Sequence, residues 1–316
     1  MIVTVTLNAA LDRTLSVPNF QVGLRHRATS SLTLPGGKGV NIARALKLLG
    51  EPVIATGLAG GRTGTTIIEE LTREGILNDF VRIADESRTS TAVADPTNNV
   101  VTEINEHGPS VAEAEIEVLL DKLRYLSKGA DIVVLAGSLP RDVPEDFYAT
   151  AIRQLRRDGL ATALDATGPR LRAALAAEPA IVSPNRREAE EILGYEFRDD
   201  ADAVSGAIEL VEMGAEIALV HDEGGCVACV TEGRHRRVVR AHLPPLEEVV
   251  STVGSGDAFL AGFLAAWYVK QEPEEAIRRA VAVGAANTQT LGAGLFDPND
   301  VEPFLRQVEV VALDTV

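Results

Sequence analysis

The sequence predicts an α/β protein with a mostly parallel central sheet covered by helices and a small second sheet. From residue 53 onward, short apolar strands alternate with amphipathic helices, which is the pattern of parallel strands joined by crossover helices. Two segments, residues 13–35 and 88–107, interrupt this alternation with strands that have one polar face. We expect them to form a lid over an α/β domain built from residues 1–12, 36–87 and 108–316.

The composition excludes several classes of protein. The chain has 316 residues, of which 46% are hydrophobic, enough for one large domain with a substantial core. Its longest apolar run, residues 259–269, is too short to span a bilayer, and no secretory signal pattern is present, so we expect a cytoplasmic protein. The net charge of −16 argues against nucleic acid or a membrane as a partner. An anionic substrate therefore needs a local positive site.

The individual elements follow from periodicity. Residues 1–7 predict a buried strand, and Asp12 is expected just beyond its carboxyl end, where open α/β sheets bind ligands. Residues 26–34 alternate, which predicts a lid strand with Leu32 on its apolar face. Further strands are predicted at residues 53–58, 88–95, 100–105, 132–135, 160–164, 180–182 and 217–220, and helices at about 65–74 and 145–157, with a helical stripe over 112–123.

A glycine-rich turn that leads into an apolar helix predicts an anion site at residues 251–262. Gly254 and Gly256 allow the backbone to turn successive N–H groups toward one point, and the helix N-terminus adds its own donors. A carboxylate in such a turn repels phosphate unless it has a task. Asp257 is therefore a candidate base for a hydroxyl that attacks a phosphoryl group, with simple helix capping as the alternative.

A second glycine-rich segment, residues 35–41 (PGGKGVN), opens a helix that ends at Gly50. Its glycines allow close approach to a ligand, and Lys38 and Asn41 supply polar contacts. It is not a Walker A loop, since Gly39 follows the lysine, and the chain has no dinucleotide-binding fingerprint after a strand. An ordinary glycine-rich turn is the alternative interpretation.

Polar residues also follow the predicted strands at Ser138, Asp165 and Asn185, so they should line one edge of the sheet. Asn185 and Glu188 are spaced to reach one hydrated Mg²⁺, or to form a capping box, which is the commoner role of this spacing. Cys226 and Cys229 lie three apart in a predicted strand and point to opposite faces, and no further ligands complete a metal shell. We expect both cysteines to be structural.

Five segments together resemble the ribokinase-like sugar kinases of the phosphofructokinase-B family. They span nearly the whole chain: residues 7–12, 35–44, 136–140 (AGSLP), 184–188 (PNRRE) and 252–257 (TVGSGD). Residues 104–109 (INEHGP) are most similar to 1-phosphofructokinases and tagatose-6-phosphate kinases. The resemblance implies a three-layer α/β/α domain with a β-sheet lid.

The resemblance also implies roles for individual residues. Asp257 would be the catalytic base, and the backbone at Gly254, Ser255 and Gly256 would form the anion hole. The sugar phosphate would contact Asp12, Gly37, Lys38, Asn41, Arg88 and Ser138, together with Arg27 from a second subunit. ATP would contact Asn185, Glu188, Thr252, Gly225 and Asn287, and Glu188 would bind Mg²⁺ through water.

One segment and one single residue depart from the family pattern. His221, Asp222 and Glu223 stand where relatives have a small turn beside the nucleotide, and Ser183 replaces a lysine that many of them carry. We therefore expect an ATP- and Mg²⁺-dependent kinase, most similar to enzymes that convert fructose 1-phosphate to fructose 1,6-bisphosphate. The alternatives are a tagatose-6-phosphate or fructose-6-phosphate kinase and, from another class, a non-catalytic sugar-phosphate-binding protein. A homodimer is also expected, joined face to face through the apolar faces of the lids, with Leu32 on that face and turned away from the main domain.

Overall fold

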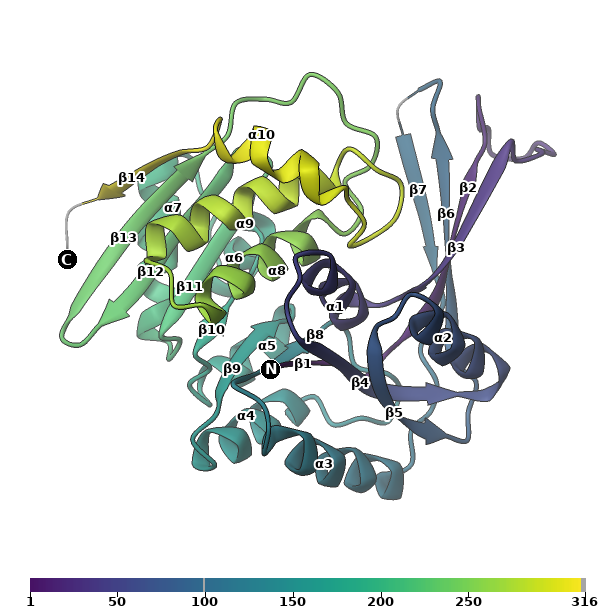
Figure 1. Cartoon of the computed structure of the whole chain (residues 1–316), viewed down its shortest axis with the longest axis horizontal. Coiled ribbons are helices and arrows are strands. Elements are labelled where there is room, and N and C mark those ends of the chain that lie inside the picture. The colour runs from purple at the N-terminus through teal and green to yellow at the C-terminus, as the bar shows by residue number, and fades with distance from the viewer. Residues whose placement is uncertain (99, 314–316) are drawn as a thin grey trace.

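The computed structural model describes residues 1–98 and 100–313, and it contains two separate sheets (Figure 1). The larger sheet has ten strands in the order β14-β13-β12-β11-β10-β9-β8-β1-β4-β5, of which β11 to β5 are parallel and the first three antiparallel. Its strands are β1 (Ile2–Thr6), β4 (Val53–Gly60), β5 (Leu77–Ile83), β8 (Ile132–Ala136), β9 (Ala161–Asp165), β10 (Ile181–Val182), β11 (Ile217–Asp222), β12 (Gly225–Glu232), β13 (His235–His242) and β14 (Glu309–Leu313).

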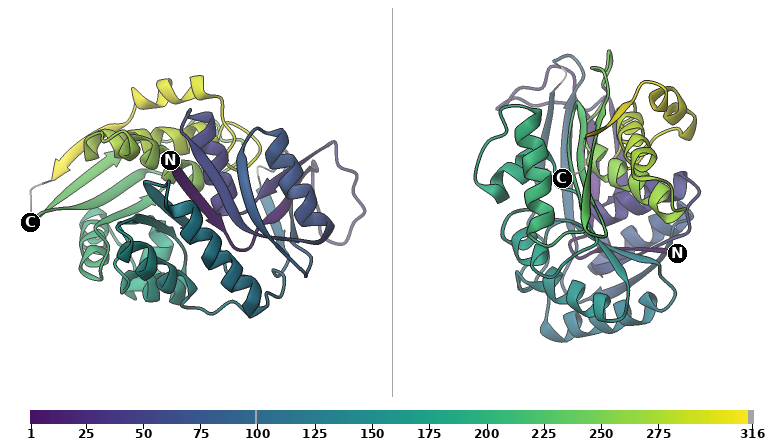
Figure 2. Two further views of the ribbon diagram at one scale, coloured as in Figure 1. Left: turned by 60° about the horizontal axis from the view of Figure 1, so that its bottom comes forward. Right: turned by 90° about the vertical axis from the view of Figure 1, so that its left-hand side faces the viewer.

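Helices cover both faces of this sheet, as the two turned views in Figure 2 show. One face packs against α1 (Lys38–Leu48), α2 (Gly61–Arg73), α8 (Ser255–Tyr268), α9 (Pro273–Asn287) and α10 (Val301–Leu305). The other packs against α3 (Glu113–Ser127), α4 (Phe147–Arg157), α5 (Gly168–Leu175), α6 (Arg186–Leu193) and α7 (Asp200–Glu212). The predicted three-layer α/β/α architecture is confirmed.

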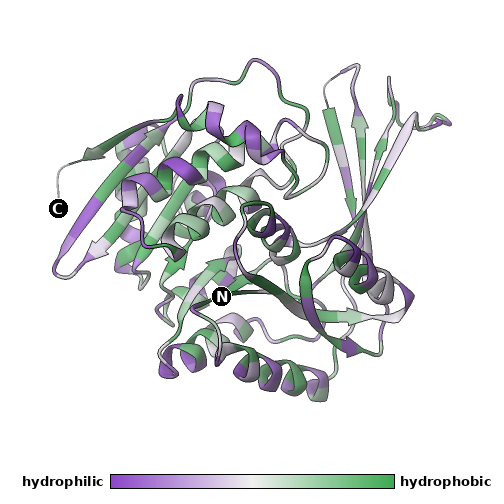
Figure 3. Ribbon diagram, in the orientation of Figure 1, coloured by the Kyte–Doolittle hydropathy of each residue, from purple (hydrophilic) through white to green (hydrophobic). Residues whose placement is uncertain are grey.

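The central strands are apolar on both sides because helices cover both sides of them. In β1, Ile2 packs into the core on one face, whereas Val3 and Val5 pack into the core on the other. Figure 3 shows these inner strands as mainly hydrophobic, whereas the outer helices carry polar residues on their exposed sides. Among the described residues, no helix combines the length and apolar character that crossing a bilayer requires.

The second sheet has four strands in the order β3-β2-β6-β7 and projects from one side of the main domain (Figure 1). Its strands are β2 (Ala10–Ser16), β3 (Ser30–Gly36), β6 (Arg88–Asp95) and β7 (Val100–Asn105). β2 runs parallel to β6 and antiparallel to β3. The strands at 88–95 and 100–105 are as predicted from the sequence. Asn99, in the predicted turn between them, lies outside the described residues.

Three predictions about this region are wrong. Asp12 does not follow a strand of the main sheet, because β2 begins at Ala10 and Asp12 lies within it. β3 begins at Ser30, so residues 26–29 precede the strand. Leu32 does not face away from the main domain either. Its side chain lies against Gly292 and lines a cavity beneath the sheet.

Cys226 and Cys229 lie in β12, and both are buried and unpaired. Cys226 packs into the core on one face of the main sheet and Cys229 into the core on the other. Burial is the main cause that raises the pKa of each thiol. Both thiols therefore stay protonated, and neither is suited to act as a nucleophile or metal ligand. The structure agrees with a structural role for both.

We predict that neither thiol reacts with a thiol-specific reagent such as dithionitrobenzoate in the native protein, whereas both react after denaturation. The reason is that 4% of Cys226 and 0% of Cys229 are exposed. A chelator should leave the melting temperature unchanged. Rapid modification of either thiol under native conditions, or unfolding by the chelator, would contradict a purely structural role.

Candidate active site

The turn before α8 has a backbone that only glycine adopts easily. Gly254 has φ of 81°, in the left-handed region, and a Cβ on it would lie 2.5 Å from the Cα of Ala293. Asn287 braces the turn from behind: its Nδ2 donates to the carbonyl of Val253 at 3.1 Å, and its Oδ1 accepts from the N–H of Gly294 at 2.8 Å. The unpaired donors at the start of α8 are thereby held next to Asp257.

Asp257 is buried in the first turn of α8, with 6% of its surface exposed. Its Oδ2 accepts a hydrogen bond from Nδ2 of Asn41 at 2.8 Å. Burial raises the pKa of Asp257 to about 7, and the Asp165 charge adds to this shift, while Lys38 and the hydrogen bond from Asn41 oppose it. The carboxyl group can therefore accept and release a proton near neutral pH.

Lys38 lies in the first turn of α1 and contacts two carboxylates. Its Nζ is 2.6 Å from Oδ1 of Asp165, at the carboxyl end of β9, and 3.9 Å from Oε1 of Glu188. Burial works against the ammonium, but the charges of Asp165, Asp257 and Glu188 outweigh it and raise the pKa of Lys38. Lys38 was predicted to hold the sugar phosphate, whereas the structure places it among carboxylates.

Asn185 and Glu188 form the capping box that was the alternative interpretation. Oδ1 of Asn185 accepts from the N–H of Glu188, and Oε2 of Glu188 accepts from the N–H of Asn185, both at 2.9 Å. Burial raises the pKa of Glu188. The capping box uses Oε2, whereas Oε1 faces Lys38. Within the described ranges, no group of three or more His, Cys, Asp and Glu side chains could hold a metal ion. Oε1 of Glu188 is the carboxylate oxygen that the capping box leaves unused, and carboxylate oxygens are the kind of ligand that Mg²⁺ accepts.

Arg44 positions Asn41 from inside the protein. This arginine is 2% exposed, and its NH1 donates to Oδ1 of Asn41 at 3.3 Å, which leaves Nδ2 of Asn41 to bond Asp257. Arg44 also donates to the carbonyls of Ala293 at 2.9 Å and Pro35 at 2.7 Å, and it forms a two-pronged contact with Glu74 at 2.5 and 3.0 Å. One side chain thus connects α1, the end of β3 in the second sheet and the loop beside Gly254.

A cavity of about 390 Å³ lies between the small sheet and the main domain. Burial raises the pKa of Asp12 on its wall, although the nearby Arg88 opposes the shift. The predicted site residues that line this cavity are Asp12, Gly37, Lys38, Asn41, Arg88, Ser138, Gly254 and Asp257. Segments far apart in the sequence therefore meet at one place.

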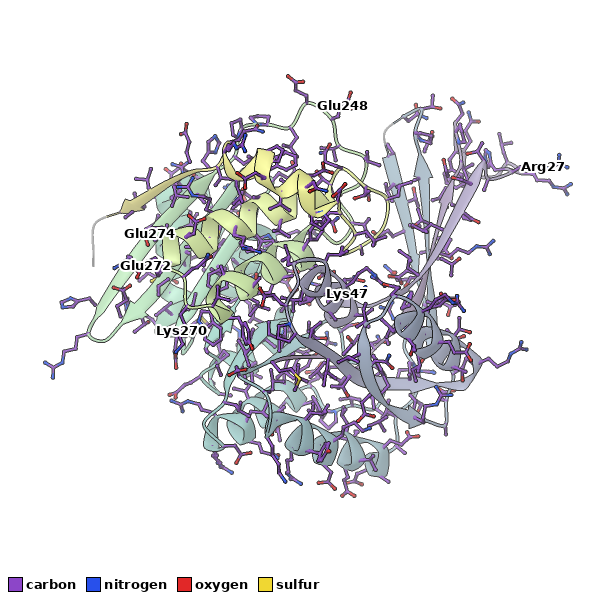
Figure 4. All side chains as sticks on the ribbon, viewed as in Figure 1. Arg27, Lys47, Glu248, Lys270, Glu272 and Glu274 are labelled. Carbon is purple, nitrogen blue, oxygen red and sulfur yellow. The ribbon has the colours of Figure 1, made fainter. Side chains whose placement is uncertain are left out.

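Other predicted residues lie elsewhere. Arg27 is at the outer end of the small sheet, as Figure 4 shows, and it does not line this cavity. Thr252 is exposed, and Ser255 and Gly256 are half-buried at the start of α8, outside the cavity wall. Asn287 is fully buried and braces the turn. Its side chain is therefore not open to the nucleotide that it was predicted to contact.

Gly225, predicted to contact the nucleotide, has a simpler structural explanation. It begins β12 with φ of 140°, and a Cβ on it would lie 2.1 Å from the carbonyl oxygen of Ala241 in the neighbouring strand. Glycine is therefore required by strand packing at this position.

Residues 221–223, which depart from the family pattern, place a histidine ring beneath the glycine-rich turn at the start of α8. The ring of His221 stacks on Phe259, with centroids 4.6 Å apart, and lies against Gly256. Burial lowers the pKa of His221 to about 4, so the imidazole is neutral at pH 7. Asp222 accepts from the N–H of Gly224 at 2.8 Å and caps the β11–β12 turn. Neither Asp222 nor Glu223 lines the cavity of Asp257.

Two residues of this site were not assigned a role from the sequence. Asp165 was noted at a strand end, and that position is the signal that places it beside Lys38. Arg44 was part of the motif at residues 35–44 but looked like an ordinary helix residue. No local pattern reveals that its side chain is buried.

The comparisons with known proteins agree along nearly the whole chain. The family model described as pfkB family carbohydrate kinase matches residues 6–300. A 1-phosphofructokinase of Rhodobacter capsulatus is 33% identical over 100% of this chain and 99% of its own. A tagatose-6-phosphate kinase of Staphylococcus epidermidis is 29% identical over 98% of this chain and 99% of its own.

Solved structures give the same result. Phosphofructokinase-2 of Escherichia coli in complex with substrates and products has a TM-score of 0.89 at 28% identity, covering 96% of this chain and 98% of that one. A possible 1-phosphofructokinase of Thermotoga maritima has a TM-score of 0.88 at 28% identity, covering 99% of this chain and 100% of that one. The chain therefore belongs to the pfkB family of carbohydrate kinases and is a sugar-phosphate kinase of that type.

Proposed function

We propose that this protein transfers the γ-phosphoryl group of ATP to the primary hydroxyl of a ketohexose monophosphate, and that the substrate is fructose 1-phosphate. The observation that carries the proposal is Asp257, a buried carboxyl group whose pKa is raised to about 7 and which lines a cavity together with Asp12 and Arg88. Support for the substrate comes from the 33% identity to a 1-phosphofructokinase. Tagatose 6-phosphate and fructose 6-phosphate are the competing substrates.

In the proposed reaction, Asp257 takes the proton of the attacking hydroxyl as the new O–P bond forms. The bond between the γ-phosphorus and its bridging oxygen breaks, and ADP leaves with the bonding electrons. The N–H groups at the start of α8, turned inward by Gly254, would stabilise the charge on the transferring oxygens. Asn41 would keep the carboxylate of Asp257 aimed into the cavity through its 2.8 Å hydrogen bond.

Lys38 would balance charge in this reaction. It faces Asp165, Asp257 and Glu188, so one ammonium serves three carboxylates. A bound Mg²⁺ would supply the missing positive charge and orient the γ-phosphoryl group. In this chain Glu188, through water, and Asn185 beside it would hold that ion against the ATP phosphates.

We also propose that two copies of the chain associate through their small sheets. The edge strand β7 leaves Val100 and Ile104 53% and 61% exposed, and Val22 and Leu24 in the β2–β3 loop are 94% and 62% exposed. A sheet edge with exposed apolar residues favours association. Arg27, in the same loop, would then reach the site of the partner. A tetrameric inhibited form of Escherichia coli phosphofructokinase-2, 28% identical, has also been solved.

We predict that Asp257→Asn keeps the shape of the site but lowers turnover by about 10²–10⁴, the usual effect of losing a general base. An assay that couples ADP release to a colour change measures this directly. The amide can still accept the hydrogen bond from Asn41, so binding of the sugar phosphate should change little. Near wild-type turnover in the variant would refute the role of Asp257 as the base.

The same substitution should stabilise the fold, most strongly above neutral pH. The folded-state pKa of Asp257, about 7, exceeds its ordinary value of 3.8, so folding disfavours the charged form. This penalty is absent below the unfolded pKa, grows as pH rises, and is complete above about pH 7. The melting temperature of Asp257→Asn should therefore exceed that of the wild type by more at pH 8 than at pH 5. An equal or reversed difference would contradict a raised pKa.

A substrate panel identifies the acceptor. We expect ATP-dependent turnover with the highest kcat/KM on fructose 1-phosphate, lower values on fructose 6-phosphate and tagatose 6-phosphate, and very low values on free fructose. A preference for tagatose 6-phosphate would move the assignment to that kinase. Tight binding of a sugar phosphate without turnover on any acceptor would instead support the non-catalytic binding protein.

We expect a dimer in sedimentation velocity experiments at assay concentration, and Ile104→Asp should shift it toward the monomer because the charge enters the proposed interface. Val118→Asp, on an exposed position of α3, is the matched control, since Val118 is 52% exposed but lies away from the small sheet. A wild-type monomer with full activity would refute the proposed assembly.

A further inference from the structure

The buried side chain of Arg44 uses every donor that it has. A guanidinium carries five N–H groups and no acceptor, and here each N–H group has one partner. The acceptors are both carboxylate oxygens of Glu74, Oδ1 of Asn41 and the carbonyls of Ala293 and Pro35. Turning the guanidinium in any direction would leave a buried donor without a partner, so its orientation is strongly preferred.

The partners of Arg44 belong to segments on both sides of it. Its helix, α1, lies between α8 and the base of the small sheet (Figure 1). Pro35 is in β3, whereas Ala293 is in the loop that packs against Gly254 at the start of α8. The guanidinium is therefore held in place relative both to the small sheet and to the turn that precedes Asp257.

The contact with Arg44 determines which end of the Asn41 amide faces Asp257. Asn41 is 6% exposed, and its Oδ1 accepts from Arg44 at 3.3 Å while its Nδ2 donates to Asp257 at 2.8 Å. Because a guanidinium can only donate, the amide oxygen has to face it. The NH₂ group then has to face the carboxylate. An amide turned end for end would direct its NH₂ group at the guanidinium and its oxygen at Asp257.

The two orientations of this amide have opposite effects on the ionisation of Asp257. Burial is the main cause that raises the pKa of Asp257, and the charges of Asp165 on β9 and Asp12 on β2 add to it. The charge of Lys38 on α1 and the hydrogen bond from the amide lower it. An amide oxygen in place of the NH₂ group would repel the carboxylate and accept a hydrogen bond from the protonated carboxyl group. A protonated carboxyl group cannot act as a base.

We infer that Arg44 is a positioning residue for phosphoryl transfer: it holds the amide of Asn41 in the orientation that favours the ionised form of Asp257. Arg44 acts through Asn41, and its bond to the carbonyl of Pro35 ties the same amide to the small sheet. The inference rests on the proposed role of Asp257 as the base, but it does not depend on which sugar phosphate is the acceptor.

The test compares Arg44→Met with wild type in the ligand-free protein. Difference infrared spectroscopy follows the carboxyl band of Asp257 as the pH is varied, with Asp257→Asn as the reference. Methionine fills much of the same space but donates no hydrogen bond, so the amide of Asn41 is free to reverse. The midpoint should rise by about one pH unit, the effect of losing a hydrogen bond to the charged form.

Catalysis by Arg44→Met should change in a way that loss of structure alone does not explain. At neutral pH the kcat should fall about 10- to 100-fold, because the base is misaligned and more often protonated. Part of this loss should be recovered at higher pH, where Asp257 ionises again. The KM for MgATP should stay within about two-fold of wild type, since Arg44 affects the base and not the nucleotide.

The matched control is Glu74→Gln, which removes the ion pair of Arg44 and leaves its contact with Asn41. Glu74 does not line the cavity of Asp257, and the amide oxygen of glutamine can still accept from the guanidinium. This variant should lower the melting temperature without raising the infrared midpoint. A rise equal to that of Arg44→Met would mean a general loosening of α1 and would overturn the inference.

A double variant tests whether Arg44 acts through Asn41. Asn41→Leu removes the hydrogen bond to Asp257, so it should raise the midpoint by itself, and adding Arg44→Met should raise it no further. Additive shifts would show a direct effect of the arginine charge and would contradict the inference. An unchanged midpoint in Arg44→Met would contradict it as well.

Should Arg44→Met not fold, Arg44→Lys tests the same point. Lysine keeps a charge for Glu74, but one terminal nitrogen with three donors cannot serve all the acceptors of the guanidinium, so the midpoint should still rise. A folded Arg44→Lys with the wild-type midpoint would refute the inference. A midpoint that responds to Arg44→Met in a protein that turns over no sugar phosphate would refute the proposed reaction and leave this inference standing.

Discussion

The arrangement of the site depends on one ammonium group that is shared by several carboxylates. Lys38 lies 2.6 Å from Asp165 and 3.9 Å from Glu188, and its charge also acts on Asp257. Because Asp165 and Asp257 are only 4% and 6% exposed, their charges interact with Lys38 more strongly than they would on the surface. One positive charge does not neutralise three negative ones. The raised pKa of Asp257 follows from burial and from this imbalance, and it makes a carboxyl group suitable as a base near neutral pH.

Each charged group in this cluster comes from a different part of the chain, so its geometry depends on the fold. Asp165 ends β9, Lys38 begins α1 and Asp257 begins α8. The buried Arg44 holds the starts of α1 and α8 relative to each other. It donates hydrogen bonds to Asn41 of α1 and to the carbonyl of Ala293, which packs against Gly254 at the start of α8. It also bonds Pro35, where the small sheet joins α1. A movement of that sheet would therefore shift Arg44 and change the hydrogen bond between Asn41 and Asp257.

Much of the fold was predictable, because buried parallel strands and helix starts leave clear local patterns. The strands at 88–95 and 100–105 and the phosphate-type turn at Gly254 were predicted from such patterns. Strands β13 and β14 were not, since polar residues interrupt or shorten their apolar runs: β13 carries three arginines and two histidines, and β14, at one edge of the sheet, has only five residues. β5, at the other edge, was missed for the same reason.

The contacts within the site were less predictable than its members. Lys38 carries a positive charge near a phosphate-type turn, so the sequence suggested a phosphate contact, and only the fold reveals Asp165 beside it. Likewise Arg44 belongs to a recognised motif, but only the fold reveals that its buried side chain donates a hydrogen bond to Asn41. Spacing along the chain reports local geometry, whereas these pairs depend on tertiary packing.

The most direct test is a pH titration of the Asp257 carboxyl group in the ligand-free protein. Difference infrared spectroscopy monitors its carboxyl band, with Asp257→Asn as the reference that lacks this band. We predict a midpoint near pH 7, because burial and the Asp165 charge raise the pKa of Asp257. Asp165→Asn should move the midpoint to lower pH, because it removes a negative charge that raises the pKa of Asp257. The positive charge of Lys38, which lowers this pKa, would then be opposed less. A wild-type midpoint in the ordinary carboxyl range, or one that Asp165→Asn leaves unchanged, would contradict the account.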